Sequence, residues 1–113
     1  MERERVRGWE LSPTEAVALQ RELSEHVVLR PPEGMRVERV AGADISMSRG
    51  EDWASGGFVV LDAGTREPVA QASAVTRLGF PYVPGLLSFR ELPVLEVAWE
   101  RLEVKPDLII FDG

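Results

Sequence analysis

Four consecutive apolar residues near the end of the chain, Leu108 to Phe111, constrain the fold more than any other feature. They follow a proline, and a continuous apolar run without polar alternation is typical of a strand buried on both faces, most often in a parallel sheet. The preceding segment "VLEVAWERLEV" (94–104) carries apolar residues at i, i+3, i+4 and i+7, the spacing of an amphipathic helix. A helix that leads into a parallel strand is the crossover unit of an α/β protein.

The earlier part of the sequence predicts the elements onto which this unit packs. Ser12, Pro13 and Glu15 form a capping-box start, and a helical pattern continues until "RPPEG". Apolar segments with short connections then predict consecutive antiparallel strands, and "RGEDWASG" between the first two is expected to be a loop. The expected helices cover about 13–29 and 88–103, and the expected strands cover about 36–47, 57–62, 68–76 and 107–112.

These elements predict a single α/β domain over residues 1–113, with a mixed sheet. Three antiparallel strands and a helix come first, and the last strand returns parallel beside the first strand. A strand of the buried type needs cover on both faces, and residues 13–29 are the remaining helix that could provide it. We therefore expect the sheet to be incomplete at the C-terminus and the chain to be the N-terminal part of a larger domain.

Composition limits the possible functions. Thirteen basic and nineteen acidic residues give a net charge of −6, which disfavours generic nucleic-acid binding unless the acids hold a metal or a basic surface lies elsewhere. The absence of cysteine excludes disulfides, thiol chemistry and cysteine-based zinc sites. "MERERVRGWE" has no apolar core of a signal peptide, and no apolar run approaches the roughly 18 residues of a membrane span. A cytoplasmic protein with no membrane partner is expected.

Three carboxylates are candidates for a metal site. Asp44 lies within "VAGADIS" and Asp112 ends "LIIFD", so both sit among apolar residues on expected strands. An ionised carboxylate there is costly unless it is paired, hydrogen-bonded or bound to a metal. If the two strands are neighbours, the carboxylates repel unless a divalent cation lies between them, and oxygen ligands favour Mg²⁺ or Mn²⁺ over zinc. Glu91, at the start of the following helix, could be a third ligand.

Simpler roles remain open for all three residues. Asp44 could cap a strand end, and Asp112 with Gly113 could begin a turn. Glu91 is the last residue of "SFRE", which is itself a capping-box pattern starting at Ser88. Arg90, next to Glu91, could bind a phosphate or form a surface ion pair.

Three segments together resemble the N-terminal motifs of the endonuclease V family: "VAGADIS" (40–46), "PYVPGLLSFRE" (81–91) and "PDLIIFDG" (106–113). The resemblance implies a ribonuclease H-like fold. It implies a Mg²⁺-dependent endonuclease of DNA repair, with Mn²⁺ as a substitute, that hydrolyses the second phosphodiester bond 3′ to deoxyinosine. An inosine-specific endoribonuclease and a truncated, non-catalytic lesion-binding fragment are the alternatives.

The resemblance also assigns roles to single residues. It implies that Asp44, Glu91 and Asp112 are the catalytic metal ligands and that Tyr82 is a wedge at the lesion. It implies a pocket for the turned-out base, formed by Val83, Pro84, Gly85, Leu87 and Gly113. Family members continue beyond "DG" into a segment that supplies a lysine, a further metal-site residue and covering helices. We therefore expect little activity from these 113 residues alone.

Overall fold

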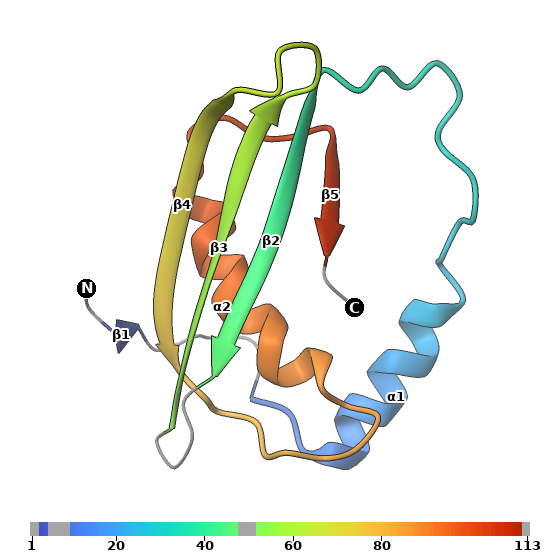
Figure 1. Cartoon of the computed structure of the whole chain (residues 1–113). Helices are drawn as coiled ribbons and strands as arrows, with labels where there is room; N and C mark the ends of the chain where they lie inside the picture. The colour runs from blue at the N-terminus through green and yellow to red at the C-terminus, as the bar shows by residue number, and fades with distance from the viewer. Residues whose placement is uncertain (1–2, 5–9, 48–51, 112–113) are drawn as a thin grey trace.

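The computed structural model describes residues 3–4, 10–47 and 52–111. Its elements are β1 (Arg3–Glu4), α1 (Pro13–Ser24), β2 (Arg39–Met47), β3 (Trp53–Asp62), β4 (Pro68–Arg77), α2 (Ser88–Arg101) and β5 (Leu108–Phe111). The strands form one five-stranded sheet in the order β1-β4-β3-β2-β5 (Figure 1). Asp112 and Gly113 lie outside the described residues.

The expected mixed sheet is confirmed. Strands β2, β3 and β4 are antiparallel neighbours, and β5 lies parallel beside β2, with pairs running from Val40–Leu108 to Ala43–Phe111. This is the ribonuclease H-like order of strands. The sequence did not predict β1, a two-residue strand whose Arg3 and Glu4 pair in parallel with Val75 and Thr76 of β4.

Helix α2 covers one face of the sheet and forms the main core with it (Figure 1). Strand β3 alternates strictly between buried and less buried residues over its first eight positions, as a strand covered on one face does. The ring of Phe58 on β3 meets Trp99 of α2 edge to face, with centroids 5.7 Å apart. The fully buried residues of this core include Ala41, Ala54, Val60, Ala74, Val94 and Ala98.

Helix α1 begins as predicted but ends early. The Ser12 hydroxyl accepts a hydrogen bond from the Glu15 amide, and the Glu15 carboxylate accepts one from the Ser12 amide, so the capping box is confirmed. The predicted end at residue 29 is wrong, because the helix stops at Ser24. Val27 and Val28 are β-branched and exposed, and prolines follow shortly, so neither propensity nor packing extends the helix.

Helix α1 also does not cover the second sheet face, for which it was the only candidate. Its buried Ala16 packs in a second cluster with Phe80, Leu86 and Phe89, beyond the end of the sheet. In Figure 1, α1 lies to the side of the sheet, past β5. The second face of the sheet is exposed at Gly42, Asp44, Ser46, Val59, Gln71 and Ser73.

The start of β3 corrects a second expectation. Residues 53–56, expected to be loop, belong to this strand, which starts at Trp53 and not at residue 57. Ala54 and Gly56 are buried beneath α2, so the strand is held by a helix that lies far away in the sequence. The other expected bounds differ less: β2 starts at Arg39, β4 ends at Arg77, α2 ends at Arg101 and β5 spans Leu108–Phe111.

Strand β5 is parallel as expected, but its expected burial on both faces is wrong. Among the described residues it lies at the edge of the sheet, with β2 as its neighbour, and Leu108, Ile110 and Phe111 are exposed. A continuous apolar run is therefore not sufficient evidence for a covered strand.

Candidate metal site and recognition loop

Strand β2 places Asp44 on the exposed face of the sheet. Side chains on β2 point alternately to the two faces of the sheet. Ala41 and Ala43 are buried beneath α2, whereas Asp44 lies on the opposite face and is exposed. The backbone N–H of Ile45 donates a hydrogen bond of 3.0 Å to Oδ1 of Asp44. Across the ladder Asp44 pairs with Gly57, which has no side chain to cover it. The carboxylate is therefore held in place and remains accessible.

Glu91 does not cap helix α2, so the capping-box alternative is wrong. The N-cap is Leu87, which makes no side-chain cap bond, and Ser88 is already the first helical residue. The Glu91 amide bonds to the carbonyl of Leu87 at 3.2 Å, as an ordinary residue of the first turn does. The half-buried carboxylate of Glu91 is therefore available for another role.

Asp44 and Glu91 line the same hollow, with a volume of about 540 Å³. The N-cap residue Leu87, Ser88 of α2 and Phe111 of β5 also line it. Two of the three predicted metal ligands thus line one hollow, although β2 carries one of them and α2 carries the other. The third, Asp112, follows Phe111 directly in the sequence but lies outside the described part of the chain.

The donors in this hollow fit a hard divalent cation. They are carboxylate oxygens, without histidine or cysteine, and such oxygen donors suit Mg²⁺ or Mn²⁺. Among the described residues, no three His, Asp or Glu side chains gather closely enough to hold a metal ion. A pair of carboxylates can still form part of a Mg²⁺ site, because this ion often takes waters and substrate phosphates as its other ligands.

The exposed sheet face forms a second hollow that shares Asp44. Its volume is about 630 Å³. Small and polar residues line it beside Asp44, namely Gly42, Ser46, Ser55, Gly57, Gln71 and Ser73. The Asp44 carboxylate can therefore be approached from the open face of the sheet as well as from the Glu91 side. No local pattern in the sequence predicted this surface.

Asp107 is a further residue that the sequence analysis missed. Its Oδ2 accepts hydrogen bonds from the backbone amides of Glu38 (2.9 Å) and Arg39 (3.1 Å), and its own amide donates to the Arg39 carbonyl at 3.0 Å. The bonds from Glu38 and Arg39 lower the pKa of the Asp107 carboxyl below its ordinary value. Together these contacts fix the start of β5 against the start of β2. An aspartate between a proline and an apolar run was the available signal.

The "FPYVPGLL" loop holds Tyr82 out from the protein. Phe80 and Leu86 are buried in the α1 cluster and anchor the loop at both ends, whereas Tyr82 between them is 69% exposed. The Leu86 amide closes a turn by bonding to the Val83 carbonyl at 3.0 Å. Gly85 has a φ of +84°, a left-handed conformation that glycine adopts at low cost.

The structure places the other predicted pocket residues in this loop or beside it. Val83 is half-buried and packs against the second cluster, which contains Ala16 of α1. Pro84, Gly85 and Leu87 are exposed. The predicted pocket residue Gly113 lies outside the described residues, so the pocket itself stays a prediction.

The helices in the described part of the chain are too short and too polar to span a bilayer.

The sheet order and the two elements that carry Asp44 and Glu91 define a ribonuclease H-like α/β protein. The sequence profile of Endonuclease V matches residues 21–113. The chain belongs to the endonuclease V family.

Individual relatives agree with this assignment. Endonuclease V of Myxococcus xanthus is 64% identical over 108 residues, which are 96% of this chain and 46% of the relative. The crystal structure of endonuclease V from Streptomyces avermitilis superimposes with a TM-score of 0.88 at 42% identity, over 99% of this chain and 50% of that one. The chain spans about half the length of the curated relatives it matches.

Nucleic acid is present in a similar solved structure. Endonuclease V of Ciona intestinalis was solved in complex with a 24mer DNA that contains an inosine followed by a ribo-adenosine. It superimposes with a TM-score of 0.67 at 26% identity, over 88% of this chain and 45% of that one.

Proposed function

We propose that the protein is a DNA-repair endonuclease that hydrolyses the second phosphodiester bond 3′ to deoxyinosine, with Mg²⁺ or Mn²⁺ as cofactor. The observation that carries the proposal is the shared hollow of Asp44 and Glu91 in a chain of the endonuclease V family. The Ciona complex with inosine-containing DNA supports the choice of substrate. In this proposal the 113 residues form the N-terminal part of the nuclease domain, and the cytoplasmic location stays a prediction.

Asp44, Glu91 and Asp112 are the residues that would hold the metal. A divalent ion bound by carboxylates supplies an activated water and stabilises negative charge on the phosphate and the leaving oxygen. Asp44 and Asp112 each follow the last described pair of the β2–β5 ladder, Ala43 and Phe111, which supports their acting together. The approach to Asp44 along the exposed face would leave room for a nucleic-acid backbone.

The protein's own groups orient these ligands. The Ile45 amide holds one oxygen of Asp44, so the other oxygen is free to turn toward the hollow. Asp107 binds the start of β2 and thereby fixes the pairing of β5 with β2, beginning at Leu108. Asp112 follows four residues after Leu108. Glu91 is carried by a helix whose inner face is fully buried against the sheet, and this limits its movement. Such preorganisation makes a carboxylate site effective.

Tyr82 would act as the wedge at the lesion. Its exposed ring projects from a loop that two buried side chains anchor and two prolines stiffen. Turning a base out of a duplex costs a few kcal/mol of unstacking, and an inserted side chain fills the gap that remains. The backbone of residues 83–87, together with Gly113, would then receive the turned-out hypoxanthine.

A cleavage assay with the full-length protein tests the proposal. We expect Mg²⁺-dependent nicking of a duplex that contains one deoxyinosine and no nicking of the same duplex with deoxyadenosine. Asp44→Asn should abolish the nicking, whereas the matched control Glu33→Gln, in the exposed connection before β2, should retain it. A fully active Asp44→Asn protein would refute the assignment.

The same assay separates the alternatives. Faster cleavage of inosine-containing RNA than of the matched DNA would favour the endoribonuclease. Inosine-dependent binding without any cleavage, unaffected by Asp44→Asn, would favour a lesion-binding fragment. The half-length match to the relatives is the observation that keeps this last alternative in the test.

A further inference from the structure

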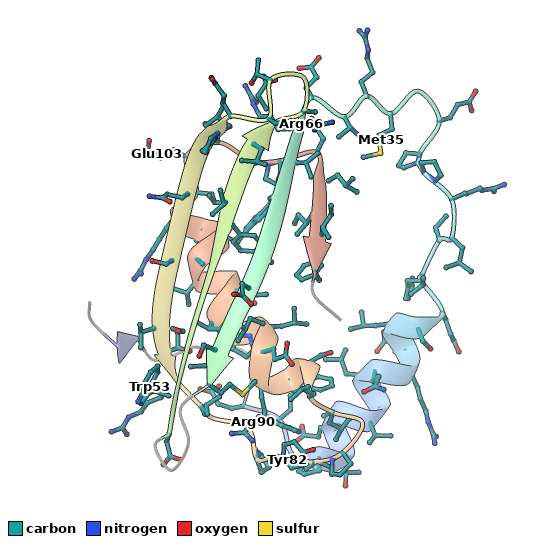
Figure 2. All side chains as sticks on the ribbon, in the orientation of Figure 1. Met35, Trp53, Arg66, Tyr82, Arg90 and Glu103 are labelled. Atoms are coloured by element: carbon teal, nitrogen blue, oxygen red, sulfur yellow. The ribbon has the colours of Figure 1, made fainter. Side chains whose placement is uncertain are left out.

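The side chain of Arg90 extends from the first turn of α2 toward the loop that carries Tyr82. The guanidinium carbon Cζ lies 5.9 Å from the centre of the Tyr82 ring, within the range of a cation–π contact. Figure 2 shows both residues at the same end of the molecule. The contact therefore links a rigid helix to the most exposed ring of the loop.

The environment of Arg90 shows that its side chain is packed. Its Nε atom is buried and has no hydrogen-bond partner, although the residue as a whole is only half-buried. An arginine free to move would place this donor in water, because a buried and unpaired N–H is unfavourable. The side chain is thus held against the protein, and its charged group faces the ring.

Among the described residues, the Tyr82 ring makes no ring or cation–π contact other than that with Arg90. The backbone of the loop is anchored by Phe80 and Leu86, but these contacts do not fix the Tyr82 side chain, which is 69% exposed. A ring that must enter a base stack loses affinity if it is ordered only on binding. A contact with a charge on a rigid helix orders the ring before DNA arrives.

We propose that Arg90 is a positioning residue that orients Tyr82 for lesion recognition. This inference rests on the proposed function, in which Tyr82 is the wedge. Arg90 precedes Glu91 on the same turn of α2, so the helix that carries a metal ligand also sets the ring that meets the lesion. The competing role is a direct contact between Arg90 and a DNA phosphate.

The first experiment tests the contact without DNA. The full-length protein is labelled with 3-fluorotyrosine, and the ¹⁹F resonance of Tyr82 is assigned with Tyr82→Phe. Arg90→Met keeps an unbranched apolar side chain but removes the charge, and it should shift or broaden this resonance. Arg90→Lys should restore part of the effect, and Arg36→Met, which removes an exposed positive charge elsewhere, should leave the resonance unchanged. An unchanged resonance in Arg90→Met would overturn the proposal.

The second experiment measures affinity for a deoxyinosine duplex and for its unmodified counterpart, without divalent metal. Arg90→Met should weaken binding to the inosine duplex alone, by about two- to fivefold, as expected for an exposed cation–π contact. The loss should disappear in the Tyr82→Ala background, because the ring on which Arg90 acts is then absent.

Other outcomes reject the positioning role. An equal loss of affinity for both duplexes would identify Arg90 as a phosphate ligand if the slope of log affinity against log salt also falls by about one. If the fold-losses of affinity from Arg90→Met and Tyr82→Ala multiply when both substitutions are combined, Arg90 acts independently of Tyr82. If the ¹⁹F resonance moves but neither Tyr82→Ala nor Arg90→Met changes inosine affinity, the wedge role fails, and the role of Arg90 in recognition fails with it. Loss of nicking in Asp44→Asn would still support the nuclease.

Discussion

Gly56 of β3 lies directly beneath helix α2, and Gly56→Ala should therefore destabilise the protein. A Cβ atom at this position would lie 3.0 Å from Cγ1 of Val94 and 3.2 Å from Cδ2 of Leu95. Val94 is completely buried, and its β-branched side chain has little freedom to rotate. The helix must therefore move away from β3 by a few tenths of an ångström.

The expected magnitude follows from two opposing effects. Overpacking a well-filled core by one methyl group costs about 1–3 kcal/mol. Replacing glycine by alanine recovers about 0.4–1 kcal/mol, because the unfolded chain loses freedom. The expected net loss in the free energy of unfolding is therefore about 0–2.6 kcal/mol. Because α2 carries Glu91, the same displacement should lower the rate of nicking.

Gly42→Ala is the matched control. Gly42 is also a strand glycine of the same sheet, but a Cβ there would meet nothing within 4 Å. Only the unfolded-state effect remains, so this variant should be more stable by about 0.4–1 kcal/mol. The two variants should be compared by denaturant unfolding of the full-length protein. Their free energies of unfolding can be compared if their m-values are equal. If Gly56→Ala is as stable as Gly42→Ala, the close packing of α2 on β3 is refuted.

Three further predictions concern the site, the loop and the register of β5. Glu91→Gln keeps the shape of the side chain but removes the charge, so it should abolish Mg²⁺-dependent nicking while unfolding stays within about 0.5 kcal/mol of the parent; full activity would exclude Glu91 as a ligand. Gly85→Ala should cost about 1–2 kcal/mol from its left-handed backbone, with φ at +84°, and weaken inosine-duplex binding; unchanged stability and affinity would contradict this. Asp107→Asn should reduce stability most at neutral pH. The lowered pKa of Asp107 means that its charged form stabilises the fold above the unfolded value of about 3.9, and this contribution is lost as pH falls through the folded pKa. The difference in stability between Asp107→Asn and the parent should therefore shrink at acid pH, and a difference that does not change with pH would refute this.

The order and type of most elements could be predicted from the sequence because they depend on local patterns. The capping box at Ser12 satisfies the first turn of α1 with residues three apart. The apolar run after Pro106 and the amphipathic stretch before it predicted the parallel strand β5 and the helix α2. The two-residue strand β1 offers no such pattern, and its pairing with β4 depends on a distant partner.

The candidate site could be predicted only in part. Asp44 stood out as a charge among apolar strand residues, and the structure places it in one hollow with Glu91. The role of Glu91 could not be decided from "SFRE", because a capping box and a first-turn ligand have the same spacing. Asp107 was missed because its partners, the amides of Glu38 and Arg39, lie almost seventy residues earlier.

The sequence by itself therefore determined the order and type of most helices and strands, the carboxylates that could bind a metal and the motifs of the endonuclease V family. Periodicity, capping and charge in an apolar segment all act over a few residues, and they can be recognised without coordinates. The tertiary structure decided how far β3 extends and that Glu91 does not cap helix α2. Strand β3 begins at Trp53, where Ala54 and Gly56 are buried beneath α2, and α2 begins at Ser88 with Leu87 as its N-cap, so that the Glu91 side chain makes no cap bond. These outcomes depend on the burial of residues far apart in the chain, which no local pattern encodes.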